Sequence, residues 1–182
     1  MAGDGDHGIG MSRGSGAARE AADQTEGGVQ TVLSAAGAAF GDRAGGTSGI
    51  LWGLLLDGVG QQLGDTDAMS DEAVARAVQG SATRLQEFSK AQLGDKTMLD
   101  ALFPFVDSLV DAVDEGTPLA LAWRDAAAVA TEAAQETSSL TPKIGRARPL
   151  AERSVGTPDP GAVSLALIVT AIGDVLAGGS SS

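Results

Sequence analysis

The chain has 182 residues, of which 43% are apolar, 20% charged and 3% aromatic, and its net charge is −12. This length and composition suffice for one domain with a full apolar core and exclude a disordered chain. The negative field repels nucleic acid and anionic membranes, so we expect neither as a partner. The sequence contains no cysteine, which excludes disulfides and thiolate zinc sites.

The first residues place Asp4, Asp6 and His7 among glycines. Two carboxylates one residue apart in a glycine-rich loop are hard oxygen donors, suited to Mg²⁺ or Ca²⁺. The alternative is an acidic, flexible tail. An EF-hand is excluded, because Gly8 stands at its third ligand position and Ser15 at the closing glutamate.

Apolar residues at helical spacing predict seven helices, and no alternation typical of strands is found. Neither a repeat nor a linker interrupts the chain, so we expect a single all-α domain over residues 1–182, with 178–182 as a disordered tail. The start shows no basic region followed by an apolar run, and we expect a cytoplasmic protein. The predicted helices cover residues 12–24, 29–40, 50–59, 71–88, 98–113, 118–136 and 161–176.

Several residues mark how these helices begin or bend. Ser70 is expected as an N-cap, and Thr117 as an N-cap with Pro118 at the first helical position. Pro104 lies inside the apolar pattern and is expected to kink its helix. The apolar run from Ala162 to Ala177 is short for a membrane span and is interpreted as a buried core helix.

The glycine-rich segment from Gly41 to Gly49 runs directly into the apolar helix at 50–59, which we expect to be buried. The free N–H groups and the positive dipole end of that helix make an anion site, to which Thr47 and Ser48 add hydroxyls. The alternative role of these two residues is N-capping. The segment is not a P-loop, because Thr47 stands where lysine is required.

Residues 137–158 lack strong periodicity and carry four of the twelve basic residues. Arg146, next to Gly145, can clamp a phosphate, although a surface salt bridge is the plainer interpretation. His7 is the only histidine, and alone it is more often a structural hydrogen-bonding residue than a base or ligand. Acidic glycine loops, a helix N-terminus and a basic cluster together suit a Mg²⁺–nucleotide or another phosphate ligand.

Four motifs follow one another along the chain, at Gly3–Gly8, Gly45–Gly49, Gly94–Asp100 and Gly145–Ala162. In this order they resemble the nucleotide-binding L subunit, or C-terminal domain, of dihydroxyacetone kinases. The resemblance implies a barrel of antiparallel amphipathic helices, eight in the family, with the nucleotide at one rim. By this resemblance the first helix of that fold is missing here.

The resemblance also implies the site. Asp4 and Asp6 would hold a pair of Mg²⁺ ions, Met98 would pack on adenine, and Arg146 would reach a phosphate; no catalytic residue is expected beyond the metal ligands. The residues expected to line ADP or ATP are His7, Gly8, Ile9, Gly10, Thr47, Ser48, Ser89, Met98, Arg146, Asp159, Pro160 and Gly161.

The sequence departs from the family at its start. The family has a third aspartate five residues before the position of Asp4, and that position precedes Met1. Without it and the first helix, the metal site has two carboxylates, and we expect an apolar groove to be exposed along the open seam of the barrel.

The resemblance implies a Mg²⁺-dependent kinase for dihydroxyacetone or a related ketose such as erythrulose. This chain would deliver the phosphate, and a separate K-type subunit or domain would hold the ketone through a histidine. The phosphate donor is either exchanging ATP or bound ADP that a phosphotransferase protein recharges. The alternative is a non-catalytic, nucleotide-sensing module that binds a transcription regulator. A homodimer is a further possibility.

Overall fold

The computed structural model describes residues 6–66, 68–144 and 155–179. Within these ranges the chain forms seven α-helices and one 3₁₀ turn, and no strand. The prediction of an all-α fold is therefore confirmed. The helices group into two compact units, which meet in the sequence between Lys90 and Ala91 and are called here the N-terminal and C-terminal units. The prediction of one domain over residues 1–182 stays a prediction.

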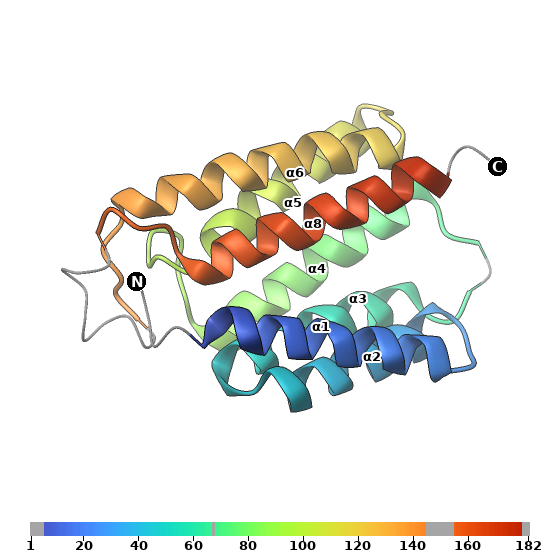
Figure 1. Cartoon of the computed structure of the whole chain (residues 1–182). Helices are drawn as coiled ribbons and strands as arrows, with labels where there is room; N and C mark the ends of the chain where they lie inside the picture. Colours follow the sequence, from blue (N-terminus) through green and yellow to red (C-terminus); the bar gives the residue numbers. More distant parts are fainter. Residues whose placement is uncertain (1–5, 67, 145–154, 180–182) are drawn as a thin grey trace. The chain divides into compact units, whose positions relative to one another are not determined.

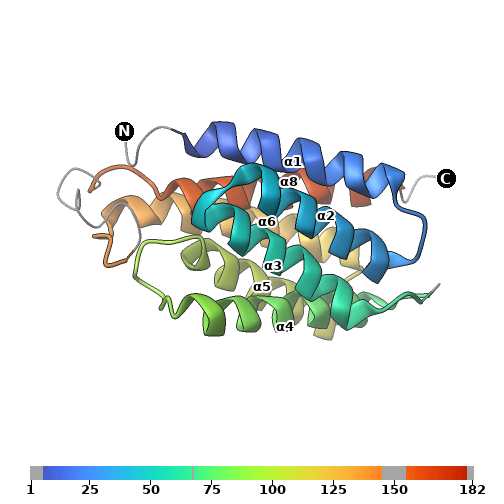
Figure 2. The same cartoon turned by 90° about the horizontal axis from the view of Figure 1, so that it is seen from below.

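The N-terminal unit consists of four helices in which each packs against the next (Figures 1 and 2). Consecutive helices run in opposite directions, and the rings of Phe40 and Trp52 lie 5.8 Å apart between the second and third. The helices are α1 (His7–Gln24), α2 (Val29–Ala44), α3 (Gly46–Leu63) and α4 (Asp71–Ser89).

Glycines let α2 and α3 approach backbone to backbone. A Cβ atom on Gly53 would lie 2.9 Å from the carbonyl oxygen of Gly37, and one on Gly49 would lie 2.8 Å from that of Gly41. Real Cβ atoms do not come this close, so only glycine fits at these crossings. Gly41 and Gly49, which were predicted to belong to a ligand-binding loop, therefore serve the packing of two helices.

Residues after α3 cap the beginning of α2. The Thr31 N–H donates to Oδ1 of Asp65 at 2.9 Å, and the Thr31 hydroxyl donates to Oδ2 at 2.6 Å. These hydrogen bonds, the side-chain one first, hold the pKa of Asp65 below its ordinary value of 3.8. Because the first N–H groups of a helix have no partner within it, this carboxylate replaces a local N-cap.

Polar contacts fix the register of α4 on α3. The Ser81 hydroxyl donates to the Leu55 carbonyl at 2.8 Å, and the Gln62 amide donates to the Ala77 carbonyl at 3.2 Å. The two helices are therefore antiparallel, because residues later in α4 contact residues earlier in α3. The end of α4 lies beside the beginning of α3.

The C-terminal unit consists of α5 (Leu99–Asp114), α6 (Leu119–Glu136), the 3₁₀ turn η1 (Thr137–Ser139) and α8 (Pro160–Gly179). The helix α6 packs against both α5 and α8. The Trp123 ring meets Phe105 edge to face, with centroids 5.1 Å apart, and the Trp123 indole donates to the Val169 carbonyl at 2.8 Å. One tryptophan thus connects all three helices.

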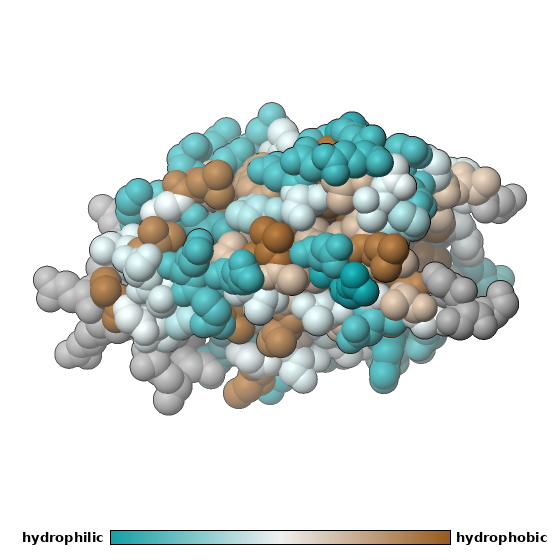
Figure 3. Space-filling view, turned by 90° about the horizontal axis from the view of Figure 1, so that it is seen from above, coloured by the Kyte–Doolittle hydropathy of each residue, from teal (hydrophilic) through white to brown (hydrophobic). Residues whose placement is uncertain are grey.

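The helix α8 is only partly buried, whereas the sequence predicted a buried core helix. Its inner face is packed in the unit, whereas Leu167 is 67% and Val175 74% exposed. By length and composition alone, Pro160–Gly178 could cross a membrane. On the face of the molecule that includes α6, apolar side chains form separate spots between polar ones (Figure 3). The buried apolar side chains of α8 are Ala162, Leu165, Ala166 and Val169.

The predicted helix boundaries need several corrections. The last helix continues to Gly179, so Gly178 and Gly179, predicted as part of the tail 178–182, are helical. The first helix begins at His7 rather than Ser12, and the second continues to Ala44. The third begins at Gly46, so most of the predicted Gly41–Gly49 loop is helical. Pro118 is the N-cap of α6 rather than its first helical residue. Ser70 does cap α4, since its hydroxyl accepts the Ala73 N–H at 3.2 Å.

Candidate functional site

The N-termini of α1 and α3 lie at the same end of the N-terminal unit. A Cβ atom on Gly10, in the first turn of α1, would lie 2.9 Å from the carbonyl oxygen of Ala44, the last residue of α2. Gly45 and Gly46 follow directly, and α3 begins. The structure thus brings the predicted residues His7–Gly10 close to Thr47 and Ser48.

The beginning of α3 carries no side-chain cap. Gly45 occupies the N-cap position with φ 65° and ψ 174°, a conformation that favours glycine, so the alternative that Thr47 or Ser48 is the cap is wrong. The first N–H groups of a helix have no acceptor within it, and the helix dipole adds positive potential. Since a Cβ on Gly45 would meet nothing within 4 Å, an anion can reach this backbone.

The beginning of α1 is also without a side-chain cap hydrogen bond, and Asp6 occupies its N-cap position. Asp6 is the one predicted metal ligand that the structure describes, because Asp4 lies outside the described residues. Among the described residues, no three or more histidine, aspartate or glutamate side chains group so as to hold a metal ion. The predicted Mg²⁺ site therefore remains a prediction that depends on Asp4 and Asp6.

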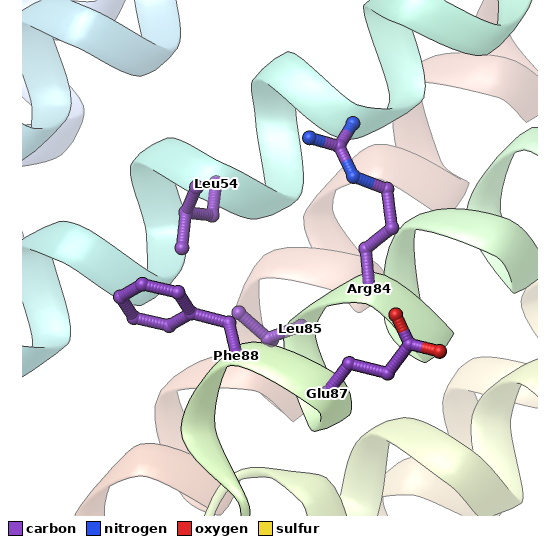
Figure 4. A pocket seen from close by; sticks show the side chains of 5 residues that line it. All are labelled: Leu54, Arg84, Leu85, Glu87 and Phe88. Carbon is purple, nitrogen blue, oxygen red and sulfur yellow. The ribbon is translucent and has the colours of Figure 1, made fainter.

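Ser89 ends α4 at the same end of this unit, where its hydroxyl donates to the Gln86 carbonyl at 3.3 Å. A shallow hollow lies beside it between α3 and α4, with Leu54 and Phe88 facing each other across it (Figure 4). Phe88 is 59% exposed and Ile50, at the beginning of α3, 52% exposed. The helix at 50–59, to which Ile50 belongs, was expected to be buried. Leu54, Arg84, Leu85, Glu87 and Phe88 line the hollow.

In the C-terminal unit, Asp100 shapes the loop before α5. Its carboxylate accepts the N–H groups of Gly94 and Thr97, the latter at 2.7 Å. Lys96 lies between them with φ 63°, the left-handed conformation, and is only 4% exposed. The loop presents Met98, which is itself buried, at the beginning of α5.

Asp159 joins this loop to the beginning of α8. Its Oδ2 accepts the Ala162 N–H at 2.8 Å, and its own N–H donates to the Thr137 hydroxyl at 2.7 Å. A Cβ on Gly161 would lie 3.4 Å from that of Met98 and 2.9 Å from Oδ2 of Asp159. Met98 and the segment 159–161 are therefore neighbours.

Burial raises the pKa of Asp159 to about 6. The Ala162 and Gly161 N–H groups and the Lys96 ammonium favour the ionised form, whereas the charge of Asp100 opposes it. Desolvation in turn lowers the pKa of Lys96, and the charge of Asp159 acts against that change. A carboxylate and an ammonium are thus interdependent inside this loop cluster.

The predicted residues fall into two groups, one in each unit. Arg146 and the rest of residues 145–154 lie outside the described residues, as does Asp4. Lys96 and Asp100 belong to the motif Gly94–Asp100, but the sequence indicates no role for either side chain. The N-terminal unit holds Asp6, His7, Gly8, Ile9, Gly10, Thr47, Ser48 and Ser89, and the C-terminal unit holds Met98, Asp159, Pro160 and Gly161.

Comparison with known structures defines the class first. The chain superposes on the dihydroxyacetone kinase of C. freundii, solved with AMP-PNP and Mg²⁺, with a TM-score of 0.60 and 24% identity over 81% of this chain and 23% of that one. This likeness shows that the all-helical fold is that of a part of dihydroxyacetone kinase and confirms the predicted fold class.

Sequence comparison then gives the family. The model of the DAK2 domain matches residues 1–174, and the chain belongs to the DAK2 domain family. It is 54% identical over 177 residues to D-erythrulose kinase of Mycolicibacterium smegmatis. It is also 32% identical over 167 residues to the ADP-binding subunit DhaL of the PEP-dependent dihydroxyacetone kinase of Escherichia coli.

The two relatives differ in how much of each the chain spans. It covers 30% of the erythrulose kinase but 78% of DhaL, while 96% and 90% of this chain are matched. The family prediction made from the four motifs is therefore confirmed. The activity, substrate and partners of those whole proteins remain matters for proposal.

Proposed function

We propose that this chain is the nucleotide-binding, phosphoryl-donating part of a short-ketose kinase. The observation that carries the proposal is the match of nearly the whole chain both to named erythrulose kinases and to a separate ADP-binding subunit. A sequence that corresponds to a segment in one case and to most of a subunit in the other is suited to a discrete nucleotide-binding role.

The end of the N-terminal unit supplies the proposed phosphate contacts. Uncapped N–H groups at the beginning of α3, with the hydroxyls of Thr47 and Ser48, would bind phosphate oxygens. His7–Gly10 would contribute from the neighbouring first turn of α1. Such fixed donors serve phosphoryl transfer, which depends on positioning and on stabilising negative charge rather than on covalent chemistry by the protein.

The C-terminal unit supplies the proposed contacts to the rest of the nucleotide. Met98 would pack on the base, and Asp159, Pro160 and Gly161 would line the nucleotide beside it, with Arg146 reaching a phosphate. Asp4 and Asp6 would hold Mg²⁺, for which carboxylate oxygens are suitable donors. When bound, Mg²⁺ supplies charge neutralisation at the phosphates of an anionic ligand in an acidic protein.

We propose erythrulose rather than dihydroxyacetone as the substrate, because the relatives named erythrulose kinases are 49–54% identical and the DhaL subunits 32–35%. The ketose would be held by a separate K-type domain or subunit. Whether ATP exchanges or bound ADP is recharged by a phosphotransferase protein is decided by nucleotide off-rates measured by rapid filtration.

The decisive experiment is calorimetric titration of the purified chain with ADP and ATP, with and without Mg²⁺, followed by addition of a K-type subunit and either ketose. We expect Mg²⁺-dependent binding, and ketose phosphorylation only when both proteins are present. No nucleotide binding under any of these conditions would overturn the proposal. Binding to a transcription regulator in a nucleotide-dependent pull-down, without phosphorylation, would favour the regulatory alternative.

A further inference from the structure

The loop before α5 holds two buried aspartates to which the proposed function gives no role. Asp95 is 8% and Asp100 9% exposed. Burying a carboxylate is costly unless hydrogen bonds compensate it. Both carboxylates accept backbone N–H groups of the loop in which they lie, so they are parts of its internal framework.

Each aspartate is joined twice to the residue three positions before it. The Thr97 N–H donates to Oδ2 of Asp100 at 2.7 Å, and the Asp100 N–H donates to the Thr97 carbonyl at 3.1 Å. In the same way, the Gln92 N–H donates to Oδ2 of Asp95 at 2.8 Å, and the Asp95 N–H donates to the Gln92 carbonyl at 3.1 Å. Because a carboxylate is a stronger acceptor than a neutral group, both turns are firmly closed.

The second of these turns encloses Met98, which lies between Thr97 and Asp100. The other carboxylate oxygen of Asp100 accepts the Gly94 N–H and so ties this turn to the beginning of the loop. On its other side, Met98 lies against the beginning of α8, since a Cβ on Gly161 would come within 3.5 Å of the Met98 nitrogen. The backbone of Met98 is therefore held from both sides.

A methionine gains more from such support than a rigid side chain would. Methionine is unbranched and has three rotatable bonds, so it adapts its shape to the surface that it contacts. Its contact surface lies in the same place each time only if the backbone that carries it is fixed. A contact that is formed in advance also costs less ordering when a ligand binds.

We propose that Asp100 is a positioning residue for the base of the nucleotide: its two carboxylate oxygens fix the backbone of Met98 before the nucleotide binds. This inference rests on the proposed function, in which Met98 packs on the base. Asp95 closes the preceding turn by the same hydrogen bonds, but that turn does not enclose Met98. Asp100 therefore acts on binding of the base and not on the phosphate contacts proposed for the N-terminal unit.

The test replaces Asp100 with asparagine, which keeps the size of the side chain but has one acceptor oxygen instead of two. In either orientation the amide NH₂ group meets the N–H of Gly94 or of Thr97, and that hydrogen bond is lost. Calorimetry measures the binding of Mg²⁺–ADP and of Mg²⁺–pyrophosphate, which has no base. We expect the affinity to fall about tenfold for ADP and less than about twofold for pyrophosphate. An equal change for both ligands overturns the proposal.

Asp95→Asn is the matched control, because it weakens an equally buried turn of the same construction. Both variants should lower the free energy of unfolding in urea, but only Asp100→Asn should change the ratio of the two affinities. In the nucleotide-free protein, the ¹³C resonance of the Met98 methyl group should move in Asp100→Asn and stay in place in Asp95→Asn. A ratio that changes equally in both variants, or a Met98 resonance that Asp100→Asn leaves unmoved, rejects the proposal.

Wild-type protein decides the question if Asp100→Asn does not fold. The amide protons of Gly94 and Thr97 should be protected from hydrogen exchange before any Mg²⁺–ADP is added. Fast exchange that slows only on binding shows that the nucleotide orders the loop, and contradicts a preformed contact. Should the wild type bind neither ADP nor pyrophosphate, the proposed function fails. The Met98 resonance of the nucleotide-free variants still decides whether Asp100 fixes Met98.

Discussion

The two units use opposite means to organise the beginning of a helix near the predicted site. In the N-terminal unit α3 begins at Gly45 with no side-chain cap, and glycines bring its backbone against α2. In the C-terminal unit α8 begins under the Asp159 carboxylate, within a cluster of buried charges.

The difference corresponds to two roles that a helix N-terminus can have. An uncapped N-terminus keeps its N–H groups available to an outside anion, at the expense of local stability. A capped N-terminus uses those groups internally and gains a fixed shape. The start of α3 is therefore suited to phosphate contact, and the start of α8 to holding a rigid turn.

The largest effect is expected from Asp6→Ala, which tests whether the uncapped N-termini of α1 and α3 bind phosphate together with a metal. We expect the Mg²⁺-dependent affinity for ADP to fall by about 100-fold or more, because the metal contributes several kcal/mol of charge stabilisation. Calorimetry measures the affinity and circular dichroism the helix content, which should stay nearly unchanged. Equal affinity in wild type and variant would refute the metal assignment.

Gly49→Ala tests the glycine packing of the N-terminal unit. The added methyl would meet the Gly41 carbonyl at 2.8 Å, so we expect a loss of about 1–3 kcal/mol in the free energy of unfolding, measured with urea. The matched control is Gly16→Ala in α1, where the new Cβ meets nothing within 4 Å. It should stabilise by about 0.5–1 kcal/mol, and destabilisation there would show that glycine replacement itself is harmful.

Asp159→Asn tests the charged cap of the C-terminal unit. A carboxyl whose folded pKa is raised to about 6 binds its proton more tightly in the folded state, so its contribution to stability is complete below pH 3.8 and is lost as the pH rises through 6. Asparagine still caps but does not titrate, and the variant should lose this pH dependence, worth at most about 3 kcal/mol. Urea unfolding at pH 4 to 7 measures it; an unchanged slope contradicts the assignment.

The smallest effect is expected from Ser70→Ala, which tests an ordinary cap away from either site group. The Ser70 hydroxyl accepts one N–H, and its loss should cost about 1 kcal/mol in the free energy of unfolding. Nucleotide affinity should be unaffected. A comparable loss of affinity would show that the position of α4 matters to binding.

Helical periodicity predicted the number and order of the helices, because apolar faces must be buried wherever the helices pack. It failed where contacts between helix backbones decide the structure. Residues 41–49 look like a loop because they contain four glycines, yet Gly41 and Gly49 lie where two helices cross. Phe88 fits the apolar spacing of α4 but is 59% exposed, because it borders the hollow between α3 and α4 instead of packing into the core.

The candidate site was predictable in its residues but not in its internal electrostatics. The motifs named Met98 and Asp159, whose proximity only the folded chain reveals. The burial of Lys96 could not be predicted, because lysine in a glycine-rich loop is usually solvated. Its ammonium donates a hydrogen bond to the Leu140 carbonyl, which lies 44 positions further along the chain and is not indicated by any local pattern.

The carboxylate of Asp65 has a consequence for acid titration. Its hydrogen bonds to Thr31 hold its pKa below 3.8, so its contribution is present above that pH and is lost only as the pH falls below it. Asp159 responds near pH 6 and in the opposite sense. Mild acid therefore protonates Asp159, which adds to the stability of the folded state, while the Asp65 carboxylate that caps α2 stays ionised. A descending pH series followed by hydrogen exchange distinguishes the two carboxylates within one sample.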